Sequence, residues 1–211
     1  MNPLLLEDLF FTICDYLTLK KIIQYELISK HHLKMIRQHP WHHSLRIRKN
    51  NLLLQLINRY QLRNLDLSFS DVTDETVKLL NCHTLNLSCI DVTDESVKHL
   101  KCHTLNLSDT WVTDESVKHL KCHTLNLSGT NVTDESVKLL TCHTLNLCCT
   151  KITDESVKHL ECHTLNLRGT KVTDEGVKHF KCHTLDLSMT KVTLKGVKHL
   201  KCHNLHLFGI K

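Results

Sequence analysis

A strict 20-residue period governs most of this chain. The pair Cys-His recurs at that spacing seven times, first at Cys82 and last at Cys202. One unit, residues 102–121, reads CHTLNLSDTWVTDESVKHLK, a diverged copy starts at Leu62, and the sequence stops halfway through an eighth unit. Periods of about 20 to 50 residues are typical of solenoids and propellers, in which each unit buries its apolar face only against its neighbours.

Each unit divides into a short strand and a short helix. Residues 104–108 alternate polar and apolar side chains, so two leucines share one face of a strand. Residues 112–120 predict a helix, with Thr113 as N-cap and acidic residues at the positive end of the helix dipole. We expect Asp114 and Lys118, four positions apart, to form an ion pair that faces water. Helices this short are stable only when they pack against neighbours.

The unit resembles the leucine-rich repeat, whose framework is L-x-x-L-x-L-x-x-N/C-x-L. The match falls on Cys102, Leu105, Leu107, Thr110 and Val112, and Thr, Ser or Ile stands where the family usually has Asn. Over residues 62–211 the resemblance implies an α/β solenoid of about seven and a half coils. It also implies a parallel sheet on the concave face and short helices on the convex face.

The period explains why the chain holds as many as 11 Cys and 18 His. Leu62 occupies the position that Cys fills in later units, which indicates an apolar core position where free Cys packs as a small hydrophobe. The alternative is a metal site, because His99, Cys102 and His103 have ligand-like spacing. We favour core filling, since adjacent Cys102 and His103 should point to different faces. Repeated ligands would also lie about 4.8 Å apart, against about 2.0–2.3 Å for zinc bonds. We therefore expect no metal and no cofactor.

Charge and hydropathy argue against several functional classes. With 27 basic and 22 acidic side chains, the net charge of +5 is too balanced to indicate a nucleic-acid partner. No stretch approaches the ~20 apolar residues that span a membrane. Glu7, Asp8 and Asp15 interrupt the apolar N-terminal run, so we interpret it as a folded helix rather than a secretory signal. The sequence thus predicts an intracellular, cytoplasmic protein, with the nucleus also open, and no catalytic residues, because no nucleophile stands beside a base.

Two neighbouring positions after the strand carry most of the variation between units. One series is Phe69, Cys89, Asp109, Gly129, Cys149, Gly169, Met189 and Gly209; the other is Asp71, Asp91, Trp111, Asn131, Lys151, Lys171, Lys191 and Lys211. A variable surface on a constant scaffold is where partner specificity would lie, and neutral drift between copies is the alternative. The second series turns from acidic to basic along the chain, which favours an acidic protein partner. We predict a target-binding stripe formed by Phe69, Trp111, Lys151, Arg168, Lys171, Met189 and Lys191.

The amino-terminal residues do not share the repeat. Residues 1–45 predict a domain of two or three short helices, and residues 46–61 a basic linker with a helix that caps the first coil. The first segment resembles an F-box. In chain order the matching residues are Leu5, Leu9, Ile13, Tyr16, Leu17, Lys20, Ile22, Ile23, Leu27, Ile28, Ser29, Lys30, Pro40 and Trp41. Leu6 and Leu19 stand where the family usually has proline, and His32 where it has an aromatic residue.

An F-box followed by leucine-rich repeats implies a substrate receptor of a Skp–cullin–F-box ubiquitin ligase. The resemblance implies that the Skp adaptor is bound by Leu5, Leu9, Ile13, Leu17, Ile22, Ile23, Ile28 and Trp41. The repeats would hold the target, and other subunits would transfer ubiquitin. The alternative is a plain interaction scaffold, in which the helices only cap the solenoid. The absence of Ala, with 5 Gly and 2 Pro, indicates an A/T-rich coding sequence, as in a giant DNA virus or a protist.

Overall fold

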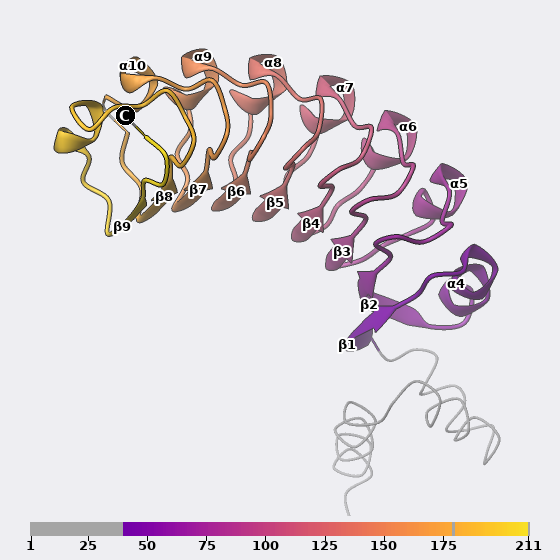
Figure 1. Cartoon of the computed structure of the whole chain (residues 1–211). Coiled ribbons are helices and arrows are strands. Elements are labelled where there is room, and N and C mark those ends of the chain that lie inside the picture. The colour runs from indigo at the N-terminus through magenta and orange to yellow at the C-terminus, as the bar shows by residue number, and fades with distance from the viewer. Residues whose placement is uncertain (1–39, 179, 211) are drawn as a thin grey trace, which may run out of the picture.

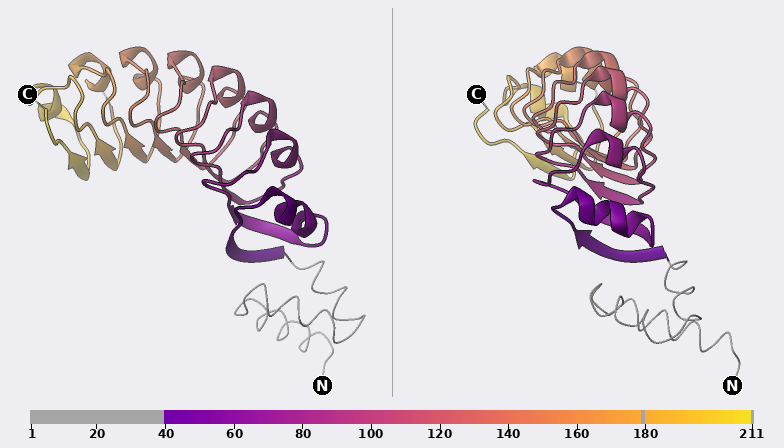
Figure 2. Two further views of the ribbon diagram at one scale, coloured as in Figure 1. Left: turned by 45° about the vertical axis from the view of Figure 1, so that its right-hand side comes forward. Right: turned by 90° about the vertical axis from the view of Figure 1, so that its right-hand side faces the viewer.

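Parallel strands form one open sheet in the computed structural model of the chain, which describes residues 40–178 and 180–210. Nine strands in these residues pair strictly in chain order, from β1 to β9. Figure 1 shows the strands along the inner side of an arch and the short helices along its outer side, and Figure 2 shows the same layers from two other directions. The architecture is a leucine-rich-repeat solenoid, which confirms the fold class predicted from the 20-residue period.

The repeat strands are short and in register. The strands are β1 Pro40–Arg46, β2 Gln61–Asp66, β3 Thr84–Asn86, β4 Thr104–Asn106, β5 Thr124–Asn126, β6 Thr144–Asn146, β7 Thr164–Asn166, β8 Thr184–Asp186 and β9 Asn204–His206. Equivalent residues of successive units lie side by side, as Leu105 and Leu125 do. Each repeated side chain therefore forms a column that runs along the solenoid.

The sheet begins earlier than the repeat pattern indicates. β1 pairs in parallel with β2, with Trp41 opposite Leu62 and an irregular register between Trp41 and Ser44. The domain boundary expected between residues 45 and 46 therefore falls inside a strand, and Trp41 belongs to the sheet. Because this strand is a single copy without the repeat signature, the period does not reveal it.

The helices on the outer side are shorter than the sequence predicts. They are α4 Asn50–Ile57, α5 Asp74–Val77, α6 Asp94–Val97, α7 Asp114–Val117, α8 Asp134–Val137, α9 Asp154–Val157, α10 Asp174–Val177 and the 3-10 helix η1 Gly196–His199. Thr113 caps α7 as expected, accepting a hydrogen bond from the Glu115 amide. α4 buries Leu53 and Leu56 against the first coil.

The core is a continuous stack of identical layers. Each central coil buries two leucines, a Cys and two β-branched residues, as in the unit with Leu105, Cys102 and Val117. Thr110, at the usual Asn position of the family, is buried and donates to the Leu107 carbonyl at 2.7 Å. The hydroxyl thus satisfies a backbone group within its own coil, whereas Ile90 at the equivalent position is simply buried in the core.

The predicted ion pair between Asp114 and Lys118 is wrong. Lys118 pairs instead with Glu115, at 2.8 Å. The Asp114 carboxylate turns towards the next coil, where it accepts hydrogen bonds from the Thr133 amide at 2.9 Å, the Thr133 hydroxyl at 2.6 Å and the Ser136 hydroxyl at 2.5 Å. Spacing on one helix could not reveal this, because the partners lie about one period away in the sequence. The same contacts recur from Asp74 and Asp94, and we call them the Asp–Thr–Ser network.

Candidate interaction surfaces

The predicted target-binding stripe lies in the turns that follow the strands, and all seven of its side chains are exposed. The apolar members are the most conspicuous, because Phe69 is 68% exposed, Trp111 65% and Met189 55%. Lys151, Arg168, Lys171 and Lys191 are exposed as well. The stripe is therefore available to a partner along the border of the sheet where the strands end.

Two of the seven stripe residues, Phe69 and Met189, have strained backbone. The first variable series adopts a left-handed conformation in every described coil, with φ of 55° at Phe69, 58° at Met189 and about 70° at Gly129 and Gly169. Glycine adopts this conformation freely, whereas an L side chain costs roughly 1–2 kcal/mol. Phe69 and Met189 add this strain without burying their side chains, a combination found where residues serve binding. Glycine at three positions of this series was the sequence feature that could have predicted the left-handed turn.

Stripe residues contact residues of adjacent coils. The Trp111 indole nitrogen donates to the Asp91 carboxylate at 3.2 Å. The Arg168 guanidinium lies 3.5 Å from the Met189 sulfur, and the Lys151 ammonium donates to the Asn131 side chain at 3.0 Å. The structure thus brings Arg168 and Met189 together, while Phe69 lies two coils away from Trp111 and contacts the Arg48 guanidinium, 5.8 Å from its ring centre.

The second variable series changes from acidic residues, Asp71 and Asp91, to lysines along the chain. Lys151, Lys171 and Lys191 occupy the same position in three consecutive coils, and none of them has an ion pair within the described residues. At the acidic end, the Asp71 carboxylate binds groups of this same chain. The Asn50 amide and the Lys49 ammonium bind its carboxylate, and they lower its pKa below the usual value. Asp71 is therefore neutralised within the chain, whereas the three lysines at the basic end have no ion pair in the described residues.

The cysteine column fills the core. Cys102 is 2% exposed while its neighbour His103 is exposed, so the two side chains diverge as expected. Burial raises the pKa of the Cys102 thiol to about 12, which keeps it protonated at neutral pH. Within residues 40–178 and 180–210, no cluster of three or more His, Cys, Asp or Glu side chains has the geometry of a metal site. These observations favour core filling over the metal alternative.

Sequence reasoning missed a column of stacked histidines. The rings of His83, His103, His123, His143, His163, His183 and His203 stack face to face along the border where the strands begin. Their centroids are 4.6–4.8 Å apart and neighbouring planes differ by 10–23°. The 20-residue period could have predicted this column, because a side chain repeated once in every coil must lie beside its own copies.

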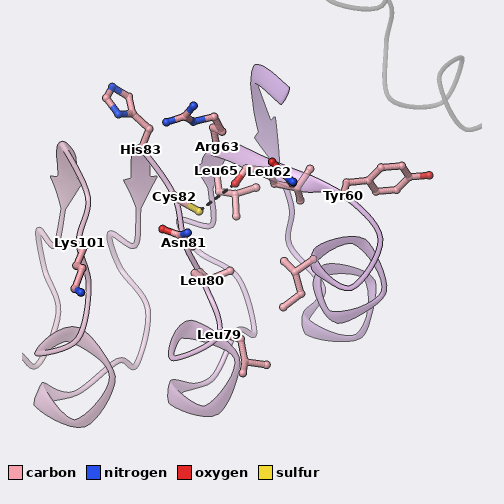
Figure 3. Close-up of a pocket in the computed structure, with 12 residues that line it drawn as sticks. Tyr60, Leu62, Arg63, Leu65, Leu79, Leu80, Asn81, Cys82, His83 and Lys101 are labelled. Atoms are coloured by element: carbon pink, nitrogen blue, oxygen red, sulfur yellow. Dashed lines mark hydrogen bonds between the residues drawn. The ribbon is translucent and has the colours of Figure 1, made fainter. Parts of the chain in front are cut away.

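A pocket of about 390 Å³ lies where the α4–β2 coil meets the first repeat (Figure 3). Its apolar wall includes Leu62 and Leu80, and His83 lies at its polar rim. The Cys82 thiol lies 3.6 Å from the Leu62 carbonyl, burial raises its pKa to about 12, and Figure 3 shows the His83 ring directed away from it. Cys82 and His83 are therefore not arranged as a nucleophile and its base.

The adaptor-binding residues predicted from the F-box resemblance lie almost entirely outside the described residues. This holds for Leu5, Leu9, Ile13, Leu17, Ile22, Ile23 and Ile28, while the backbone of Trp41 lies in β1. In the part of the chain that the structure describes, none of the helices has the length and apolar character needed to cross a membrane.

Comparison with known proteins agrees with the fold. A family model described as Leucine Rich repeat matches residues 123–140 and 163–180, which are two of the central units. A comparison with curated proteins gives no match. Leucine-rich repeats typically form interaction modules rather than catalytic sites, which points to binding as the role of the surfaces described above.

Proposed function

We propose that this leucine-rich-repeat solenoid is a non-enzymatic scaffold that binds an acidic protein target through the stripe. The observation that carries the proposal is the run of Lys151, Lys171 and Lys191, three exposed lysines on consecutive coils without an ion pair in the described residues. Trp111 supplies an exposed aromatic anchor of the kind that dominates interface energetics. Strained, exposed Phe69 and Met189 support the same surface.

The stripe is tested with an acidic peptide and a charge-reversal variant. We expect an oligoglutamate peptide to change the Trp111 fluorescence of the full chain, and this change to be absent in Trp111→Phe. Replacing Lys151, Lys171 and Lys191 by Glu should weaken the binding that Trp111 fluorescence reports at least about tenfold, because three favourable charge contacts become repulsive.

The matched control reverses three lysines that are already paired. Lys98, Lys118 and Lys158 lie beside the outer helices in ion pairs with Glu95, Glu115 and Glu155. Changing these three to Glu alters the net charge equally but leaves the stripe intact. Equal loss of binding in both variants would contradict a specific stripe and indicate attraction by net charge alone.

We further propose that residues 1–45 act as an F-box, which would make the scaffold a substrate receptor of a Skp–cullin–F-box ubiquitin ligase. The support is the order of apolar residues from Leu5 to Trp41 and their position before leucine-rich repeats. The other subunits would then supply the transfer chemistry, and the chain would need no cofactor. The role requires an intracellular location, in the host cell if the chain is viral.

Co-purification with a Skp adaptor separates the ligase receptor from a plain scaffold. We expect the wild-type chain to retain the adaptor and the double variant Leu9→Asp, Ile13→Asp to lose it, because apolar contacts would carry the interface. The Lys→Glu stripe variant should retain the adaptor, which keeps the two proposals independent. Absence of adaptor from the wild type, or its retention by the Leu9 and Ile13 variant, would leave only the scaffold.

A further inference from the structure

A second charged surface runs along the opposite border of the sheet from the stripe. It consists of two exposed columns on either side of the buried Cys column. One is the histidine stack from His83 to His203, and the other, two residues earlier in each coil, holds Lys101, Lys121, Thr141, Glu161, Lys181 and Lys201. We call the histidines and lysines of these columns the Lys/His ridge. The nearly balanced net charge of the whole chain does not reveal the ridge, because acidic residues at the starts of the helices offset its positive charge.

The lysines of the ridge differ from those beside the helices. Lys98, Lys118 and Lys158 form ion pairs with Glu residues three positions earlier, at 2.6–2.9 Å. Lys101, Lys121, Lys181 and Lys201 have no such pair within the described residues. Thr141 and Glu161 interrupt the column and leave two cationic parts of equal length, Lys101 with Lys121 and Lys181 with Lys201.

The final part of the ridge borders a hollow of about 370 Å³. Its lining residues are Lys178, Phe180, Lys181, His199 and Lys201. Four of the five are cationic or titrate to a cation, and Lys178 has only a long contact with Glu175, at 3.8 Å. The hollow therefore has the charge expected for an anionic group.

The stacked imidazoles present their edges rather than their faces. Each ring lies against the next at 4.6–4.8 Å, so inner faces are occupied and the ring nitrogens remain at the edge. Nδ1 of His183 lies 3.2 Å from the Thr184 hydroxyl, which leaves Nε2 as the nitrogen that can bind a ligand. A row of N–H donors suits carboxylates.

This geometry favours an acidic protein segment over nucleic acid. Single-stranded nucleic acids bind through base stacking on aromatic faces in addition to charge. Here the imidazole faces cover one another, and Phe180 is only 7% exposed. Carboxylates need only the N–H edges and ammonium groups that the ridge supplies.

Protonation of the ridge depends on the charges around it. Beside the stack lie the lysines of the ridge and Glu161 on one side, and the neutral Thr hydroxyls of the strands on the other. Arg63 lies next to His83 at one end, Asp186 and His206 lie on the last two strands, and His99, His119, His159 and His199 follow the helices. Most of these groups are cationic or neutral, so carboxylates from a partner would be the main source of compensating charge. The pKa of His143 is lowered by desolvation and then by His123 and His163, as expected for rings that repel one another when charged.

We propose that the Lys/His ridge binds a Glu- or Asp-rich protein segment, centred on Lys181, His183, Lys201 and His203, more tightly in mildly acidic than in neutral solution. As imidazoles gain protons below about pH 6.5, each adds a cationic donor to the row. The ridge is separate from the stripe, so this site does not depend on the function proposed above.

The test is a titration of the full chain with an oligoglutamate peptide at about pH 7.5 and about pH 5.5, followed by calorimetry and by the histidine ring resonances in NMR spectra. We expect about tenfold tighter binding at the lower pH, with shifts of the His183 and His203 resonances. The variant His183→Gln, His203→Gln should lose most of the pH dependence, and Lys181→Glu, Lys201→Glu should weaken binding about tenfold at both pH values. All four positions are exposed, and unchanged melting curves would show that the variants fold.

Two controls separate the ridge from the stripe and from nucleic acid. The stripe variant Lys151→Glu, Lys171→Glu, Lys191→Glu should keep the pH-dependent binding and the histidine shifts. Binding with no pH dependence, pH dependence unchanged in the His→Gln variant, or tighter binding of a single-stranded oligonucleotide at the same ring resonances would each overturn the proposal.

Discussion

The middle coils of the solenoid and its last coil follow the same backbone path but differ in the hydrogen bonds between coils. In the middle, Ser96, Ser116 and Ser136 are fully buried and donate to an Asp of the preceding coil. In the last two coils Gly176 and Gly196 take the place of Ser, and Leu194 takes the place of Asp.

The difference shows what makes the outer segments helical. Where the Asp–Thr–Ser network is complete, a four-residue α-helix forms in each coil, although such a segment has almost no helical stability alone. α5 and α10 are α-helical as well, although Thr73 makes no side-chain cap bond at α5 and Gly176 replaces Ser in α10. The equivalent segment of the next coil is the 3-10 helix η1, and Leu194 before it is 60% exposed. The repeat helices α5 to α10 all have two acidic residues in the first turn and η1 has none, so favourable charge at the helix start distinguishes them better than the apolar spacing, which is the same in both.

Acid should break the network together in the coils that follow Asp74, Asp94, Asp114 and Asp134, which is the largest effect we expect. Burial alone would raise the pKa values of Asp74, Asp94, Asp114 and Asp134, but the Ser and Thr hydrogen bonds outweigh it and lower them from 3.8. A carboxylate with a lowered folded-state pKa stabilises the protein above its unfolded pKa and loses that contribution as pH falls through the folded one. The midpoint of urea unfolding should therefore drop steeply below about pH 4. An unchanged midpoint between about pH 5 and pH 3 would contradict this origin of stability.

Removing one network carboxylate should lower the free energy of unfolding more in a middle coil than in a coil near the end of the solenoid. Asp114→Ala deletes an acceptor of three hydrogen bonds from Thr133 and Ser136, and we expect a loss of about 3 kcal/mol in the free energy of unfolding. Asp174→Ala deletes an acceptor of only two, both from Thr193, and should cost about half as much. Urea denaturation of both variants measures the difference, and equal losses would show that helix-start charge alone matters.

The same comparison explains what the sequence could predict. Strand leucines, the Cys position and the Thr113 cap follow from local spacing, and the structure confirms them. The partner of Asp114 and the stacking of His103 depend on residues one period away, so they become visible only when the coils are placed side by side. The β1 strand has no copy in the repeat, and its pairing with β2 could not be read from the period.

Restoring the missing Ser should make a late coil resemble the middle ones. A Cβ at Gly176 would meet the Asp154 carboxylate and would lie 3.1 Å from the Asp154 Cα, so the two coils must shift slightly to admit it. Because the equivalent Ser136 is accommodated beside Asp114, Gly176→Ser should recover a hydrogen bond to Asp154 and raise the free energy of unfolding by about 1 kcal/mol. Gly176→Ala is the matched control, since it supplies helix propensity without the hydroxyl and should give about half the gain. A loss of stability in both variants would mean that the coils cannot part to admit a Cβ.

The smallest effect concerns the left-handed turn, where Gly129 and Gly169 lie in inner coils and bulky Met189 lies near the end. Met189→Gly relieves roughly 1–2 kcal/mol of strain but adds entropy to the unfolded chain, so we expect a net gain of about 0.5 kcal/mol in thermal or urea unfolding. Met189→Ala keeps the strain and should give no gain. If Met189 serves the stripe, both variants should bind oligoglutamate less well, because Arg168 loses its contact with the sulfur. In Met189→Gly, stability would then rise while affinity falls. Unchanged affinity would indicate that Met189 arose by neutral drift between copies and does not serve binding.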